Sequence, residues 1–321
     1  MKCRILEPMD YSKIRGFNYQ PSWASHGIEI WGSAFDLETC RREIGLGKKY
    51  FPGMNTLRLW LSFDAYVRYP GEMPDRFHRM IELGDEFGVQ FIPTLFNGWH
   101  SIPDFGGISL EMIEYWNTGE RFRKVFSPYL EKIVKPHAGD KRVLLWDLCN
   151  EPFNSAWDSR GKSTLLNWLK KVYSGCKELG AKAPLTVGSV PNMEIVRTLE
   201  PVSDVITFHP YFAWNAWITI KEQLEHLMDE ARGYSNFMNK PLLATETGWG
   251  ALDDKKRSET LSAELSALAQ RKIGFTAHVL HHSLVADCHR PEYGPITGAG
   301  YMAFIEKDGS LRPYHDIFNS F

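Results

Sequence analysis

The chain has 321 residues, of which 43% are hydrophobic, enough to build a large core in one large domain or two smaller ones. Its formal charge of −2 at pH 7 is nearly balanced, which argues against a nucleic-acid or membrane-surface partner, because both need a concentrated basic face. The 11 tryptophans suit either a core or a carbohydrate cleft, since sugar rings pack their C–H faces on flat aromatic rings.

The first eight residues lack the apolar run of a secretion signal. No stretch approaches the roughly 18 apolar residues of a membrane span. The five cysteines are widely scattered and include no C-x-x-C pair, which favours reduced thiols over a disulfide framework or a zinc site. We therefore expect a cytoplasmic protein that binds neither nucleic acid nor a membrane.

Short apolar runs of strand length recur along the chain, each followed by a longer amphipathic segment. Several are apolar almost throughout, which is typical of parallel strands buried on both faces. No linker or low-complexity tract divides the sequence, so we expect a single domain over residues 1–321. The predicted strands are 16–19, 56–61, 89–95, 143–148, 185–188, 205–209, 242–245 and 275–280.

Helix signals occupy the segments between these strands. Pro74 and Gly88 delimit one helix, and Thr219 with Glu222 matches a capping box. The repeated alternation predicts a (β/α)₈ TIM barrel, for which about 250 residues are typical. An open doubly wound sheet is the alternative, but it usually carries a Gly-rich loop after its first strand, where this chain runs Gln20-Pro21-Ser22-Trp23. Further helices are predicted over 161–180 and 254–272.

Polar side chains follow several predicted strands at their C-terminal ends, which form the working face of such a barrel. Arg58 belongs to strand two, Glu151 follows strand four, His209 and Tyr211 come at the end of strand six, and Glu246 follows strand seven. Strands four and seven lie across the barrel mouth from each other. The sequence therefore predicts that the carboxylates of Glu151 and Glu246 face one another.

Hydrolysis of a glycoside with retention needs two carboxyl groups about 5–5.5 Å apart, one as nucleophile and one as acid and base. The nucleophile must stay ionised, and Arg58 can supply the cation and Tyr211 a phenol proton that keep it so. Asn150 precedes Glu151 and offers an amide where a sugar 2-hydroxyl would lie. This set of residue types predicts a retaining glycosidase.

The tripeptide Asn150-Glu151-Pro152, which closes a hydrophobic strand, resembles the acid/base motif of the clan A glycoside hydrolases, and of family 5, the cellulase and mannanase family, in particular. Glu246, followed by Gly248-Trp249, is similar to the nucleophile of the same group. The resemblance implies a TIM barrel in which Glu151 is the acid/base and Glu246 the nucleophile.

Other positions extend the resemblance over residues 16 to 282. Arg58 and the His209-x-Tyr211 pair fall where family members carry the same residues, and His100 is similar in place to a histidine of a family subsite. Members usually carry a tryptophan at the end of strand eight, under the sugar. Here residues 278–283 contain none, so another aromatic, Trp249 or Trp214, is expected to take over the floor, or the subsite holds a different sugar.

Aromatic and histidine residues on the predicted rim are further candidates for substrate binding. Trp99, Trp214 and Trp249 follow strand ends and can stack on sugar rings, and His281 can hydrogen-bond in a subsite. The histidines of strand eight also suggest a metal site, but neighbouring strand residues point to opposite faces, so we predict no metal. These histidines are His278, His281 and His282, with His289 beyond them.

The sequence thus predicts a retaining β-glycosidase, without a cofactor, that acts on β-linked oligosaccharides or glycosides of the β-glucoside or β-mannoside type. An exo-acting or oligosaccharide-trimming enzyme is slightly favoured over an endo-acting one. Two other hypotheses stay open. One is a non-catalytic carbohydrate-binding barrel, and the other is a metal-dependent sugar isomerase that uses the histidines of strand eight.

Overall fold

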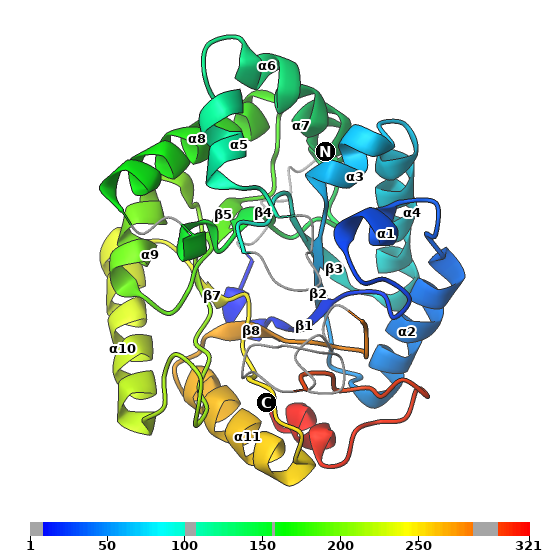
Figure 1. The fold of residues 1–321 in the computed structure, drawn as a ribbon. Helices are drawn as coiled ribbons and strands as arrows, with labels where there is room; N and C mark the ends of the chain where they lie inside the picture. Colours follow the sequence, from blue (N-terminus) through cyan, green and yellow to red (C-terminus); the bar gives the residue numbers. More distant parts are fainter. Residues whose placement is uncertain (1–8, 100–106, 156–157, 285–300) are drawn as a thin grey trace, which may run out of the picture.

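A computed structural model describes residues 9–99, 107–155, 158–284 and 301–321. Eight parallel strands form one sheet in the order β5-β4-β3-β2-β1-β8-β7-β6, which curls into the barrel seen end-on in Figure 1. The predicted TIM barrel is confirmed. The strands are β1 (Arg15–Tyr19), β2 (Thr56–Trp60), β3 (Gln90–Thr94), β4 (Trp146–Asn150), β5 (Leu185–Gly188), β6 (Ile206–Phe208), β7 (Leu242–Ala244) and β8 (Gly274–Ala277).

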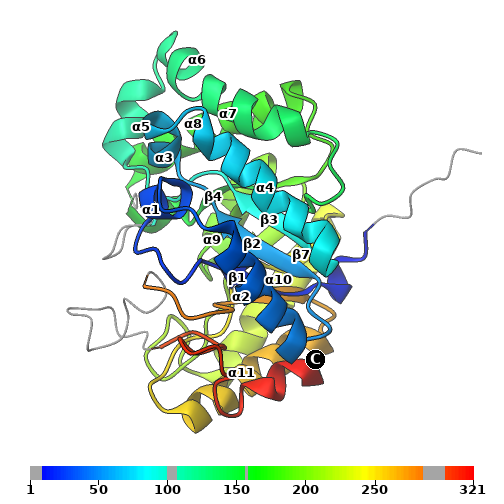
Figure 2. The same ribbon diagram turned by 90° about the vertical axis from the view of Figure 1, so that its right-hand side faces the viewer.

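Helices surround the strands, and Figure 2 shows α2 and α4 lying along the outside of β2 and β3. No described helix has the length and apolar character needed to cross a membrane. The α-helices are α1 (Gly27–Trp31), α2 (Leu37–Tyr50), α3 (Phe63–Arg68), α4 (Glu72–Phe87), α5 (Leu110–Trp116), α6 (Arg121–Val125), α7 (Ser127–Val134), α8 (Ser159–Glu178), α9 (Met193–Leu199), α10 (Lys221–Met238) and α11 (Asp254–Gln270). Short 3-10 helices are η1 (Tyr11–Lys13), η2 (Lys135–His137), η3 (Pro152–Ser155), η4 (Glu200–Val202) and η7 (His315–Ser320).

The predicted end of α4 is confirmed, and the predicted start of α10 is wrong. Gly88 adopts the left-handed conformation (φ 62°) and its amide donates to Gly84 O, as expected of a glycine that ends a helix. The helix α10 instead begins at Lys221 after Ile220, which offers no side-chain cap. Thr219 therefore lies one residue too early to form the predicted capping box with Glu222.

The strand β4 lies further along the chain than predicted, at Trp146–Asn150 rather than 143–148. Val143 makes only an isolated bridge with Phe91, because the pairing with β3 is interrupted before Thr94 meets Asp147. Asn150 is consequently the last residue of the strand. The turn that follows starts at Glu151.

The barrel interior changes from apolar to polar towards the C-terminal ends of the strands. Ile92, Leu145, Val205 and Leu243 cluster with Tyr11 and Ile14 at the N-terminal end of the barrel. Two residues further along the same strands, on the same face, come Thr94, Asp147, Thr207 and Thr245, all buried. In these four chain segments the polar groups therefore lie nearer the end of the barrel where the carboxyl ends of the strands meet.

The strands β5 and β6 stand at the two ends of the sheet order and meet without a regular ladder. Single hydrogen bonds join them instead. Thr186 Oγ1 donates to Val205 O at 2.7 Å, and the amide of His209 donates to Ser189 O at 2.7 Å. We call this junction the β5–β6 seam.

Candidate active site

Arg58 lies in the centre of the barrel with no exposed surface, and all five of its N–H groups donate hydrogen bonds. Nε and Nη2 donate to Asp147, Nη1 to Asn18 and Glu246, and Nη2 also to Asn150. Burial lowers the pKa of Arg58, but the charges of Asp147 and Glu246 outweigh this effect and raise it. The guanidinium is a fixed cation that joins three strands, β1, β2 and β4, to the segment after β7.

Asp147 holds the guanidinium in place. Its Oδ2 accepts from Arg58 and from Thr94 Oγ1, and its Oδ1 accepts from the amide of Gly188 at 2.9 Å. The sequence predicts a structural role for this residue, inside the barrel wall or facing the helices. The structure places it in the barrel interior, directly behind Arg58.

Gly188 provides the space in which these side chains meet. A Cβ atom on this residue would lie 3.0 Å from Arg58 Nη2, 3.1 Å from His209 Nε2 and 3.2 Å from Asp147 Oδ2. Contacts this short require the neighbours to move, and the three side chains are buried and hydrogen-bonded. The last residue of β5 must therefore be small.

Glu246 follows β7 and is held by donors at both of its oxygens. Arg58 Nη1 donates to Oε1, and the hydroxyl of Tyr211 donates to Oε2 at 2.7 Å. Burial raises the pKa of Glu246. The nearby charges of His209 and Arg58 and the Tyr211 hydrogen bond outweigh burial and bring this pKa down to about 2. The side chain is therefore an ionised carboxylate at neutral pH.

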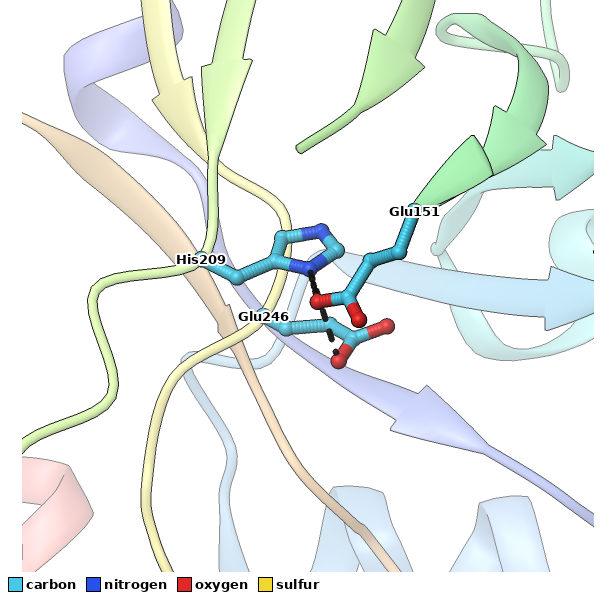
Figure 3. Close-up of side chains that lie close together, drawn as sticks. All are labelled: Glu151, His209 and Glu246. Atoms are coloured by element: carbon cyan, nitrogen blue, oxygen red, sulfur yellow. Dashed lines mark hydrogen bonds and ion pairs between the residues drawn. The ribbon is translucent and has the colours of Figure 1, made fainter. Parts of the chain in front are cut away.

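Glu151 directly follows β4 in the left-handed region, with φ 43°, a conformation uncommon for a residue other than glycine. Pro152 disfavours the right-handed helical conformation for its predecessor, and the amide of Glu151 donates to Gly188 O at 2.9 Å. The carboxyl group contacts His209 Nδ1 at 2.5 Å. The strained turn thus aims Glu151 across the barrel towards Glu246, as Figure 3 shows.

His209 lies between the two carboxyl groups, and the three side chains converge from the ends of β4, β6 and β7 (Figure 3). One oxygen of Glu151, one ring nitrogen of His209 and one oxygen of Glu246 all lie within 4.8 Å of one another. This close approach of two oxygens places the carboxyl groups nearer to the about 5–5.5 Å of a retaining pair than to the roughly 6.5–9.5 Å of an inverting one.

These three residues are also the one group of three or more potential metal ligands among the residues that the structure describes. The group does not include the strand-eight histidines on which the isomerase hypothesis depends. Because β8 ends at Ala277, His278, His281 and His282 lie beyond the strand. His289 lies outside the described residues.

Asn150 joins the site through both ends of its amide. Its Oδ1 accepts from Arg58 Nη2 at 2.8 Å, and its Nδ2 donates to Asn97 Oδ1 at 3.0 Å. The amide is therefore oriented by neighbours, with Nδ2 keeping a second N–H group.

The predicted aromatic residues differ in their contacts and exposure. Trp249 packs edge-on against Tyr211, with ring centroids 5.3 Å apart, and its Nε1 donates to Asn215. Trp214 is 43% exposed and lies under the ammonium group of Lys256. Trp99 follows β3 and is half-buried, and its amide donates to Asn97. His100 lies outside the described residues.

The two histidines after β8 have different surroundings. His281 is buried with its Nδ1 donating to His282 O, and it faces Glu43 of α2 at 4.0 Å. These contacts belong to the packing of the segment after β8 on α2, and no contact joins His281 to the two carboxyl groups in the part of the chain described. His278 directly follows the strand, its ring meets Trp60 edge-on, and its charge contributes to the low pKa of Glu246.

Some residues of the site carry no signal in the sequence. Asn18 in β1 accepts from Arg58 and donates to Thr245 O, and Gly188 gives the central side chains their space. An asparagine and a glycine within short apolar runs are too common to be singled out. His278 carries the one usable signal, since it belongs to residues 278–283, where the tryptophan expected from the resemblance is missing.

The chain matches known proteins in sequence and in fold. A model of the family described as Cellulase (glycosyl hydrolase family 5) matches residues 27–283. Mannan endo-1,4-beta-mannosidase F of Aspergillus clavatus is 26% identical over 121 residues, which cover 35% of this chain and 26% of that protein. The chain thus spans about a quarter of the length of this relative.

Two solved structures share the barrel. GH5_18 from Streptomyces cattleya, in complex with GlcNAc, has a TM-score of 0.72 at 12% identity, covering 96% of this chain and 80% of that one. Exo-beta-1,4-mannosidase Op5Man5 from Opitutaceae bacterium strain TAV5 has a TM-score of 0.72 at 20% identity, covering 95% and 58%. At these identities the likeness shows the fold. The family match over residues 27–283 shows more: the chain belongs to glycosyl hydrolase family 5, the cellulase family, whose clan A members are retaining enzymes that act on carbohydrates.

Proposed function

We propose that this protein is a retaining β-glycosidase in which Glu246 is the nucleophile and Glu151 the acid and base. One observation carries the proposal. One oxygen of Glu151 and one oxygen of Glu246 lie within 4.8 Å of each other, Arg58 and Tyr211 hold Glu246 ionised, and Glu151 contacts His209. Retention needs this division of roles between two carboxyl groups at this separation.

In the first step Glu246 attacks the anomeric carbon, and Glu151 gives its proton to the leaving oxygen as the glycosidic bond breaks. The sugar is then bonded to Glu246. In the second step Glu151 takes a proton from water, which attacks the same carbon and releases Glu246. Arg58 and Tyr211 stabilise the carboxylate that leaves in this step.

Two neighbours support these steps. His209 contacts Glu151 through Nδ1 and Thr245 Oγ1 through Nε2, so its ring is fixed and holds the carboxyl group of Glu151 towards Glu246. One N–H group of Asn150 Nδ2 donates to Asn97. The second N–H group can donate to the 2-hydroxyl of the sugar, a contact that strengthens in the transition state.

For the substrate we propose β-linked mannosides, taken as oligosaccharides or small glycosides. The relative from Aspergillus clavatus is named a mannan endo-1,4-beta-mannosidase, and the similar structure Op5Man5 is named an exo-beta-1,4-mannosidase. The two names differ in endo and exo action. We favour exo action on short substrates, in keeping with the sequence-based expectation.

The test is trapping of the covalent intermediate. The protein is incubated with 2-deoxy-2-fluoro-β-mannosyl fluoride or with the corresponding glucosyl fluoride, and its intact mass is measured beside that of Glu246→Ala. We expect one adduct on the wild type, located on Glu246, with faster labelling by the mannosyl compound, and none on the variant.

Three other outcomes would each contradict part or all of the proposal. Faster labelling by the glucosyl compound contradicts the mannoside proposal alone. An adduct on another residue overturns the assignment of Glu246. The absence of any adduct, together with no hydrolysis of aryl β-glycosides, leaves a carbohydrate-binding barrel as the better account.

A further inference from the structure

A buried carboxylate that takes no part in the chemistry lies directly behind the proposed nucleophile. Glu264, on the inner face of α11, has no exposed surface. It accepts from Thr247 Oγ1 at 2.6 Å and from the amide of Gly248 at 3.1 Å, and the amide of Phe212 also hydrogen-bonds to it. Three donors from two separate loops thus converge on one side chain.

Two of these donors directly follow residues of the proposed active site. Thr247 directly follows Glu246, and Phe212 directly follows Tyr211. Tyr211 and Glu246 are joined by the 2.7 Å hydrogen bond that orients the nucleophile. The carboxylate of Glu264 therefore hydrogen-bonds to Thr247 and to Phe212, the residues that directly follow the two partners of that bond.

Arg257, two helical turns earlier on α11, completes the attachment. It is buried, and it donates to the carbonyls of Gly248, Trp249 and His278, at 3.4, 3.2 and 2.9 Å. The end of β7 is thus joined through α11 to the end of β8 as well as to the loop after β6.

We propose that Glu264 is a positioning residue for the nucleophile, and that its ionised form holds Glu246 and Tyr211 at hydrogen-bonding distance. The inference depends on the proposed role of Glu246. Glu264 touches no substrate, and it acts through the two loops that it joins. A carboxylate accepts from all three donors, whereas the protonated acid must use one oxygen as a donor and can satisfy fewer of them.

The ionisation of Glu264 falls near neutral pH. Burial raises its pKa to about 8, against the hydrogen bonds of Thr247, Gly248 and Phe212 and the charge of Arg257, which lower it. The titratable groups that face it are Arg257 on its own helix and Tyr211 at the end of β6, and Arg312 acts in turn on Arg257. Activity that depends on the ionised form should therefore rise as the pH passes through about 8.

The test compares the wild type with Glu264→Gln by kcat/KM on a 2,4-dinitrophenyl β-glycoside from pH 6 to pH 9. This leaving group needs no proton, so ionisation of Glu151 does not shape the profile. At pH 6 both side chains are neutral, and we expect similar values. At pH 9 we expect the variant to be about 10- to 100-fold slower, the loss that follows when a reacting group is misplaced by up to about 1 Å, with KM little changed.

Glu43→Gln is the matched control. Glu43 is also a buried helical carboxylate that accepts from a hydroxyl, Tyr19, and from a backbone amide, Ser22. Its variant should follow the wild-type pH profile even where thermal stability falls. If Glu264→Gln does not fold, Thr247→Val removes one donor of the same attachment and should lose several-fold in kcat at pH 9.

The outcomes separate the two proposals. A deficit of Glu264→Gln that is the same at every pH, or no deficit, contradicts the positioning role while leaving the glycosidase proposal in place. An unchanged kcat of Thr247→Val at pH 9 likewise contradicts the positioning role of Glu264. A wild type that hydrolyses no dinitrophenyl β-glycoside contradicts the proposed function itself, and the inference with it.

Discussion

Asp147 accepts hydrogen bonds from both Nε and Nη2 of Arg58, at 3.0 and 2.6 Å, where neither side chain has any exposed surface. A guanidinium held through Nε and one Nη atom has a fixed orientation, because its N–H donors are arranged in a rigid plane. The remaining donors of Arg58 then reach Glu246, Asn150 and Asn18. Asp147 therefore determines where the positive charge meets the nucleophile.

We predict that Asp147→Ala lowers the free energy of unfolding by about 3–5 kcal/mol, since it leaves a buried cation without one of its partners. It should also lower kcat about 100-fold by freeing the guanidinium to turn. Urea unfolding and steady-state kinetics measure the two effects. Asp229→Ala is the control, because the Asp229 side chain is 64% exposed and its pair with Arg271 should contribute less than about 1 kcal/mol. Equal losses in both variants would contradict the assigned role of Asp147.

Tyr211→Phe removes the hydroxyl that donates to Glu246 at 2.7 Å. A hydrogen bond to a charged group contributes about 1.5–3 kcal/mol, so kcat should fall roughly 10- to 100-fold. The same bond helps to lower the pKa of Glu246, and its loss should move the acid limb of kcat/KM to higher pH. A variant with the wild-type acid limb would show that the hydroxyl does not act on the nucleophile.

The low pKa of Glu246 has its own consequence. Burial raises this pKa, but His209, Arg58 and Tyr211 bring it down to about 2, below the ordinary value of 4.5. A depressed carboxyl pKa stabilises the fold above the unfolded value, and the stabilisation is lost as the pH falls from about 4.5 to about 2. The rate of labelling by 2-fluoroglycosyl fluorides should therefore stay constant from pH 6, where Glu264 is neutral, to about pH 4 while the protein is folded. A midpoint near pH 5 in that range would contradict it.

Gly188→Ala should damage the site without touching substrate. Its Cβ would lie 3.0–3.2 Å from Arg58, His209 and Asp147, which are buried and cannot move freely. We expect a loss of about 1–3 kcal/mol in stability, together with a lower kcat. Gly233→Ala on the exposed side of α10 meets no atom within 4 Å and should stabilise the helix by about 0.5–1 kcal/mol. Wild-type kinetics for Gly188→Ala would mean that the site has more room than the distances indicate.

Incubation with a chelator should leave the activity unchanged. The potential ligands Glu151, His209 and Glu246 already hydrogen-bond to protein groups, and Arg58 meets the charge of Glu246. Activity is measured after dialysis against EDTA and again after addition of Mg²⁺, Mn²⁺ or Zn²⁺. Activity lost on chelation and restored by one metal would revive the isomerase hypothesis.

The sequence was sufficient to predict the barrel and the family, and it was weaker on the details of the site. Strand–helix alternation and the rim positions of Glu151 and Glu246 depend on local patterns, which a single sequence displays. The start of β4 was wrong because an apolar run continues before the ladder begins at Trp146. The capping box at Thr219 was wrong because a short motif does not fix where a helix starts.

Contacts between distant residues could not be predicted. The attachment of Thr247 and Phe212 to Glu264 joins three elements, and Glu264 looks like any charged residue of a surface helix. His281 was predicted to contact substrate, and its place against Glu43 depends on how the segment after β8 packs on α2. Such relationships follow from the tertiary structure and leave no periodic pattern in the chain.

The β5–β6 seam lies between the two carboxyl groups, because Glu151 follows β4 on one side of it and Glu246 follows β7 on the other. On this side of the barrel the spacing on which retention depends is therefore held by side-chain and single-amide bonds across the seam, including the contact of His209 with Glu151, because β5 and β6 share no continuous ladder. A parting of the seam by about 1–2 Å would carry the carboxyl groups into the range of inverting enzymes, where water fits between them. The stereochemistry of the product thus reports on how firmly this one junction of the barrel is closed.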